Sequence, residues 1–313
     1  MIVDPSDICL SIGASSATTY TRFSGSRSSL RNRLSYMENF EKSRSDNHLS
    51  LSGSRKLRRS ITWLANVSRV KSVYQKDLKR HVKFRLSFVT LTLPASQIHS
   101  DSEIKRECLA VFLQWLRDSY NVKKYVWRAE LQTNQNIHFH LTMDKYIHYA
   151  TVQKAWNRCV GKLGYIDRFE ALHGHRNPHS TEIKSVKHVK NLGGYLAGYL
   201  VGKGSNGSKK DNEIYHKRVI DGRLFGVSSY LSQIKNIGIT AAELDFGEVI
   251  NKLKQVADKV IHSDYSSTYI YSREVCQSFI YWLHHRGYKN IFESSGLTSN
   301  DLRSWLVVES SPA

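Results

Sequence analysis

The chain has 313 residues, of which 40% are hydrophobic and 11% aromatic, enough for one large or two modest globular domains, which excludes a wholly disordered protein. Its 46 Lys and Arg residues outnumber 27 Asp and Glu residues, and the formal charge of +19 favours DNA or RNA as a partner over an acidic protein or membrane surface. Four widely spaced cysteines and the lack of any apolar run of about 18 residues predict no zinc knuckle, disulfide framework, transmembrane helix or membrane partner.

Residues 1–80 are predicted to form a basic, Ser- and Arg-rich arm, because such a composition buries little apolar surface by itself. A basic arm would neutralise DNA phosphates, whereas a solvated and partly helical tail is the alternative interpretation. Apolar residues at helical spacing predict a helix over residues 61–80. The candidate phosphate contacts of this arm are Arg55, Lys56, Arg58 and Arg59.

Residues 81–204 have the pattern of an α+β domain. Their order predicts a compact antiparallel sheet with helices packed on one face. Alternating apolar residues predict strands over residues 84–93, 123–132, 137–143, 165–169 and 180–186. Helical spacing predicts helices over residues 102–120, 150–163 and 187–203.

Residues 205–313 are predicted to be a mostly helical accessory region that begins with a flexible break at 204–210. Helices are expected within 241–261 and 273–285. The sequence contains no phosphate-binding loop of the form G-x-x-x-x-G-K-[ST] around Lys203, so it does not predict an ATP-driven helicase.

His138 and His140 are two residues apart on a predicted strand, which places both imidazoles on one face of the sheet. Alone, this pattern is also typical of surface or core histidines. Glu130 precedes a tight turn at residues 133–136, and a hairpin would bring its carboxylate close to the histidine pair. Two imidazoles and one carboxylate suit a divalent ion with open positions that polarises a phosphate oxygen.

Tyr195, Tyr199 and Lys203 follow one another at intervals of four residues, so a helix would place them on one stripe. A tyrosine hydroxyl can attack phosphorus to form a phosphotyrosine, and a lysine can stabilise the phosphate charge. The alternative interpretation is an amphipathic helix whose tyrosines pack at its edge.

Together these motifs resemble those of the HUH endonucleases, specifically the rolling-circle replication initiator (Rep) proteins of small single-stranded DNA phages and plasmids. The resemblance spans roughly residues 84–203 and follows the family's motif order. Phe88–Pro94 is similar to the first motif, Ile137–Leu141 to the histidine–hydrophobe–histidine metal motif, and Tyr195–Lys203 to the tyrosine motif.

The resemblance implies that Glu130, His138 and His140 bind Mg²⁺ or Mn²⁺. It also implies that Tyr195 or Tyr199 nicks single-stranded DNA at a replication origin and retains the 5′ phosphate. The implied partners are that DNA and the host polymerase and helicase, and the implied location is the cytoplasm of a bacterial host. Lys187 and Lys190, beside the tyrosine motif, are further candidate DNA contacts.

One departure from the family pattern concerns Gly198, because related motifs often carry a lysine directly before the second tyrosine. Lys203, one turn later, is the candidate replacement. Which tyrosine attacks first is therefore left open.

Two other classes of function remain as alternatives. A non-catalytic RNA- or DNA-binding module with an RRM-like fold would use the same sheet and stack bases on aromatic residues such as Tyr125 and Trp127. A transposase or relaxase would keep the chemistry, although relaxases often carry their tyrosine before the histidines. A second cluster, His173, His175 and His179, lacks strand or helix spacing and is interpreted as a surface loop.

Overall fold

The computed structural model describes residues 7–22, 47, 49–75, 79–186, 218–241, 245–264, 266–286 and 295–301. The chain divides into two compact units: a terminal unit of residues 1–32 and 232–313, and a central unit of residues 33–231. This division differs from the one expected from the sequence, because strands near the N-terminus pair with strands near the C-terminus.

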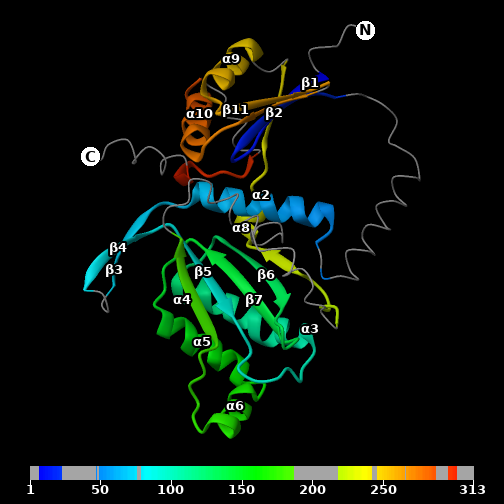
Figure 1. Ribbon diagram of the computed structural model, residues 1–313. Coiled ribbons are helices and arrows are strands. Elements are labelled where there is room, and N and C mark those ends of the chain that lie inside the picture. Colours follow the sequence, from blue (N-terminus) through cyan, green and yellow to red (C-terminus); the bar gives the residue numbers. More distant parts are fainter. Residues whose placement is uncertain are drawn as a thin grey trace. The chain divides into compact units, whose positions relative to one another are not determined.

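The terminal unit contains a five-stranded antiparallel sheet in the order β10-β1-β2-β12-β11 (Figure 1). Its strands are β1 (Ile8–Ile12), β2 (Ser16–Thr21), β10 (Ile237–Thr240), β11 (Lys259–Ser263) and β12 (Ser266–Ile270). Its two long helices are α9 (Phe246–Val256) and α10 (Arg273–His285). The C-terminal region is therefore mixed rather than mostly helical, and the helix expected over 241–261 ends at Val256, where β11 soon follows.

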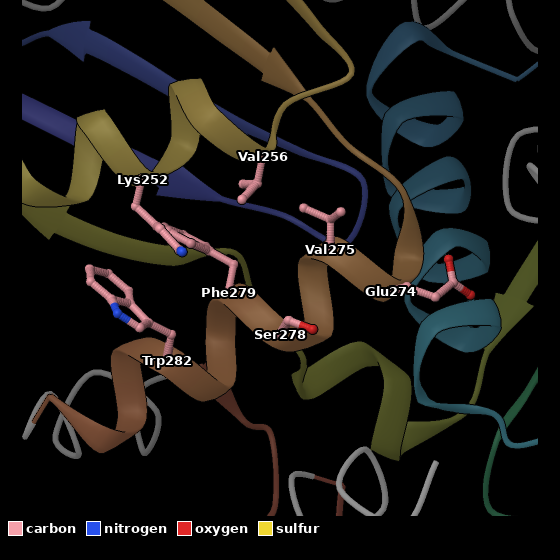
Figure 2. A pocket seen from close by; sticks show the side chains of 7 residues that line it. All are labelled: Lys252, Val256, Glu274, Val275, Ser278, Phe279 and Trp282. Carbon is pink, nitrogen blue, oxygen red and sulfur yellow. The ribbon is translucent and has the colours of Figure 1, made fainter. Parts of the chain in front are cut away.

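A groove of about 400 Å³ lies between α9 and α10 of the terminal unit. Figure 2 shows Lys252 and Val256 of α9 and Phe279 and Trp282 of α10 directed into it. The rings of Phe279 and Trp282 are stacked with their centroids 5.8 Å apart. The groove thus combines an aromatic wall with a single ammonium group.

The central unit is built on a second five-stranded antiparallel sheet, in the order β8-β5-β7-β6-β9. Its strands are β5 (Leu86–Leu91), β6 (Tyr125–Leu131), β7 (Ile137–Met143), β8 (Thr181–Val186) and β9 (Phe225–Val227). The predicted α+β class with an antiparallel sheet is confirmed. The short strand β9 was not predicted; a Cβ at Gly226 would lie 2.4 Å from Trp127 Nε1, so glycine permits its close approach to β6.

Helices cover one face of this central sheet. The helices that follow β5 are α3 (Asp101–Glu103), the π-helical η2 (Ile104–Leu109) and α4 (Ala110–Tyr120), and those that follow β7 are α5 (Tyr149–Gly161) and α6 (Tyr165–His173). Their apolar side chains form one core with the inward residues of the strands, among them Val89, Ala129 and Phe139. Because side chains alternate along a strand, the intervening residues belong to the opposite face.

Three local predictions require correction. The helix expected over 61–80 is α2 (Leu51–Val67), which begins where Ser50 Oγ accepts a hydrogen bond from Gly53 N. Lys71–Gln75 forms β3 instead, paired with β4 (Arg80–Phe84) in a two-stranded sheet. Residues 165–169 begin helix α6 rather than a strand, since Asp167 in the first turn favours a helix N-terminus. A short helix, α8 (Ser229–Gln233), follows β9.

None of the helices described combines the length and hydropathy that a bilayer-spanning segment requires.

Asp101 anchors the chain that returns to the central unit after residue 217. Its carboxylate is 2% exposed and accepts hydrogen bonds from both terminal nitrogens of Arg218, at 2.6 and 2.9 Å, and from Gln97 Nε2 at 2.8 Å. Burial opposes its charge, but these hydrogen bonds hold the pKa of Asp101 below its usual range.

Replacing Asp101 with Ala is expected to lower the free energy of unfolding by about 3 kcal/mol, because it leaves the Arg218 charge without its buried partner. Urea unfolding would measure this loss. Since the folded pKa is depressed, the difference is present above about pH 4 and disappears as the pH falls through the folded pKa. The control is Asp167→Ala, which removes an exposed partner of Arg176 and is expected to change stability by less than about 0.5 kcal/mol.

Candidate metal centre

The β6–β7 hairpin brings the three predicted metal ligands together. Glu130 lies directly opposite His138, and Arg128 lies opposite His140. Phe139 points into the helix-covered core, so strand alternation directs His138 and His140 to the other face of the sheet. The register follows from the turn over residues 132–136, where Gln132 N donates a hydrogen bond to the Asn136 carbonyl oxygen.

The ligand atoms of Glu130, His138 and His140 all lie within 4.8 Å of one another. The two imidazole Nε2 atoms are 3.0 Å apart, and Glu130 Oε2 lies 3.2 Å from His140 Nε2 and 3.7 Å from His138 Nε2. Ligands at about 2.1 Å from one ion in octahedral geometry stand about 3.0 Å from their neighbours. The spacing therefore fits one divalent ion held by three ligands with open positions.

Glu130 is held as a carboxylate with one oxygen directed at the histidines. Burial opposes its ionisation, but hydrogen bonds from His138 and His140 and the nearby Arg128 charge hold the pKa of Glu130 well below its usual range. Arg128 Nε lies 3.0 Å from Glu130 Oε1, which leaves Oε2 toward the imidazoles. A permanently ionised carboxylate supplies the negative charge that a divalent cation requires.

Strand β5 supports His140 from the side away from β6. Thr90 lies opposite His140, and its Oγ1 is 3.3 Å from His140 Nδ1. The Phe88 ring stacks on the His140 ring, with centroids 5.2 Å apart and planes inclined by 25°. When Nδ1 donates its proton to Thr90, Nε2 keeps a lone pair for a metal ion. The sequence motif placed Phe88 and Thr90 on a strand but did not reveal that they orient a ligand.

Thr90→Val is expected to weaken Mn²⁺ binding by about 10- to 100-fold, because it removes the hydrogen bond that orients the His140 ring while keeping the side-chain shape. Calorimetric titration with Mn²⁺ would measure the affinity. Thr92→Val is the matched control, since Thr92 Oγ1 donates instead to the Ser180 carbonyl oxygen. An unchanged affinity in Thr90→Val, or an equal loss in both variants, would contradict the role of Thr90.

The four basic residues predicted to contact DNA are exposed on α2, a helix that contacts β6 and β9. The α2 residue Gly53 lies against Phe225, whose ring is 3.4 Å from the position of a Cβ at that glycine. Phe225 lies opposite Arg128, the partner of Glu130. The start of α2 therefore flanks the metal-ligand face. These basic residues are Arg55, Lys56, Arg58 and Arg59.

Other sequence predictions have different outcomes. Lys187, Lys190, Tyr195, Tyr199 and Lys203 lie outside the described residues. The three histidines of the second cluster are exposed, and within the described part of the chain only Glu130, His138 and His140 form a group able to hold a metal. Tyr125 and Trp127 belong to or pack against the helix-covered core, as expected from the packing interpretation rather than from base stacking.

Residues 86–204 match the family model of Replication-associated protein ORF2, a family of rolling-circle replication initiators. The match begins at the first residue of β5 and includes both the metal-ligand hairpin and the tyrosine motif. It supports a role for this chain in the initiation of DNA replication and in binding origin DNA. Searches against curated proteins and against solved structures gave no match.

Proposed function

We propose that this protein nicks and rejoins single-stranded DNA at a replication origin through a covalent 5′-phosphotyrosine, and so initiates rolling-circle replication. The observation that carries the proposal is the convergence of Glu130, His138 and His140 on one point of an open sheet face. The family match supports it, because the matched residues include this group and the tyrosine motif.

The metal-ligand residues fit Mg²⁺ or Mn²⁺, which when bound supplies a Lewis acid for the scissile phosphate. The role of His138, His140 and Glu130 is to hold that ion with positions left open toward DNA. Arg128 and Thr90 orient two of these three ligands. Because imidazole nitrogen suits Mn²⁺ better than Mg²⁺, we expect Mn²⁺ to support cleavage at lower concentration.

In the proposed reaction the phenolic oxygen of Tyr195 or Tyr199 attacks the scissile phosphorus. A new phosphorus–oxygen bond to tyrosine forms as the bond to the 3′ oxygen breaks, and the released 3′ oxygen takes up a proton. The resulting 3′ hydroxyl primes a host polymerase. Rejoining reverses the displacement with a 3′ hydroxyl as the nucleophile, and the phosphotyrosine ester conserves the bond, so no ATP is required.

The chain length between β8 and the tyrosines is compatible with this chemistry. Val186, the last residue of β8, precedes Tyr195 by nine residues, which can span up to about 30 Å. Strand β8 is separated from β7 by β5 alone, a lateral distance of about 10 Å. Tyr195 is therefore tethered within reach of His140.

The basic residues of α2 are proposed to hold the substrate strand beside this site. Their side chains are exposed at the flank of the metal-ligand face, where they can neutralise phosphates on either side of the scissile bond. A strand held by its phosphates is positioned without being read, so selection of the origin sequence requires further contacts.

The test uses single-stranded oligonucleotides with a randomised central region, incubated with the full chain in Mn²⁺ or in EDTA. We expect cleavage at a preferred sequence only with Mn²⁺, and products whose 3′ ends a DNA polymerase extends directly. Cleavage that leaves a 3′ phosphate, or that persists in EDTA, would contradict the proposed reaction. Binding without cleavage in Mn²⁺ would favour the non-catalytic binding module.

A further inference from the structure

The β3–β4 hairpin is an exposed basic ribbon within the central unit, which Figure 1 shows extending away from the five-stranded sheet. Ser72 and Tyr74 of β3 and His81 and Lys83 of β4 alternate with the inward residues and share one face, and all four are exposed. We call this surface the ribbon face. The described residues of the hairpin include no Asp or Glu, so the ribbon face carries positive charge.

The opposite face of the hairpin is fixed to the segment that follows β7. Phe84 packs on the Tyr146 ring with centroids 5.7 Å apart, and Gln75 Nε2 donates a hydrogen bond to the Tyr146 hydroxyl at 3.2 Å. Lys71 Nζ donates to the Asp144 carbonyl oxygen at 2.5 Å. These contacts mount the hairpin firmly and leave the ribbon face open.

We propose that the ribbon face enters the major groove of double-stranded DNA. Two strands about 4.8 Å apart, with their side chains, match a groove about 12 Å wide. Lys83 and the exposed Arg80 beside the turn can contact the phosphates that border the groove. Tyr74, 51% exposed and edge-on to His81, presents a hydroxyl and ring to base edges.

Duplex DNA fits this surface better than a single strand does. A ribbon with outward polar and cationic tips is convex, whereas single strands are usually held in basic grooves by stacking aromatic side chains. The inference goes beyond nicking, because it assigns to this hairpin the recognition of duplex DNA.

The hairpin is joined directly to the metal-ligand sheet. Strand β4 is separated from β5 by Arg85 alone, and β5 carries Thr90, the partner of His140. The seven-residue separation of Lys83 from Thr90 limits their distance to about 25 Å, the length of about seven base pairs. The duplex bound by the ribbon face would therefore border the nick site closely.

The test compares the full-length protein with an Arg80→Gln/Lys83→Gln variant in binding a fluorescein-labelled 30-base-pair duplex at several salt concentrations. Loss of two phosphate contacts is expected to weaken duplex binding about 10- to 100-fold near 0.1 M salt and to reduce the salt slope by about 1.8. Binding of a labelled 30-nucleotide single strand, and its nicking in Mn²⁺, are expected to stay within about twofold.

The matched control is Lys162→Gln/Arg168→Gln, which removes the same charge from exposed positions on α5 and α6. An equal loss of duplex binding in both variants, or no loss in the ribbon variant, would overturn the proposal. So would equal losses for duplex and single strand, or a loss of binding to phosphatidylserine vesicles with unchanged duplex binding. Failure of the nicking proposal would abolish cleavage in every variant and leave the duplex comparison readable.

Discussion

Replacement of both Tyr195 and Tyr199 with Phe is expected to lower nicking by at least about 10³-fold and to eliminate the covalent protein–DNA adduct. Phe keeps the ring and removes the oxygen that attacks phosphorus. The metal-ligand residues are unchanged, so Mn²⁺ affinity should remain within about twofold of the parent. Denaturing gel electrophoresis with labelled DNA would measure product and adduct together.

The single variants distinguish the two tyrosines. If both can act, Tyr195→Phe and Tyr199→Phe each retain nicking, whereas rejoining by a second tyrosine requires the pair. Tyr149→Phe is the matched control, because Tyr149 is an exposed tyrosine of the same unit at the start of α5. Nicking at the parental rate in the double variant would exclude tyrosine as the nucleophile.

Exchange of His138 and His140 together for Gln is expected to abolish Mn²⁺ binding at millimolar concentration and to reduce nicking by at least about 10³-fold. Gln retains polar side chains at both positions but supplies no imidazole nitrogen for the ion. The parent should gain about 2.7 kcal/mol of stability when Mn²⁺ is present at 100 times its dissociation constant, and the variant should gain none. Thermal unfolding with and without Mn²⁺ measures this difference.

His175→Gln is the control for the histidine variant, since it removes an exposed imidazole of the same unit and lies outside the metal-ligand group. It should leave Mn²⁺ stabilisation and nicking unchanged. Retained Mn²⁺ stabilisation in the His138/His140 variant would move the ion to other residues. Retained stabilisation with lost nicking would separate the metal site from the reaction.

The metal-ligand hairpin was predictable because its determinants are local. Residues 137–143 were expected as a strand and form β7 with the same bounds, and a short polar turn fixes the register that sets Glu130 against His138. Alternation of side chains then decides which residues face the core. The same local rules predicted the strand that contains Phe88 and Thr90, although their contacts with His140 depend on a neighbour about 50 residues away in the chain.

Elements whose stability depends on distant partners were not predictable from the sequence. Strands β1 and β2 lie in a segment too poor in apolar residues to form a core alone, and they are completed by β10 and β12, more than 200 residues later. Strand β3 was expected to continue a helix, because valines at residues 67, 70 and 73 fit helical spacing; pairing with β4 determines its conformation.

The most direct test of the proposed function is to trap the protein on a cleaved single-stranded oligonucleotide in Mn²⁺, digest the complex and identify the peptide that carries the nucleotide by mass spectrometry. The account predicts a 5′-phosphate linked to Tyr195 or Tyr199, formed in Mn²⁺ and absent in EDTA. A nucleotide linked to any other residue, or cleavage that leaves no covalent peptide, would contradict it.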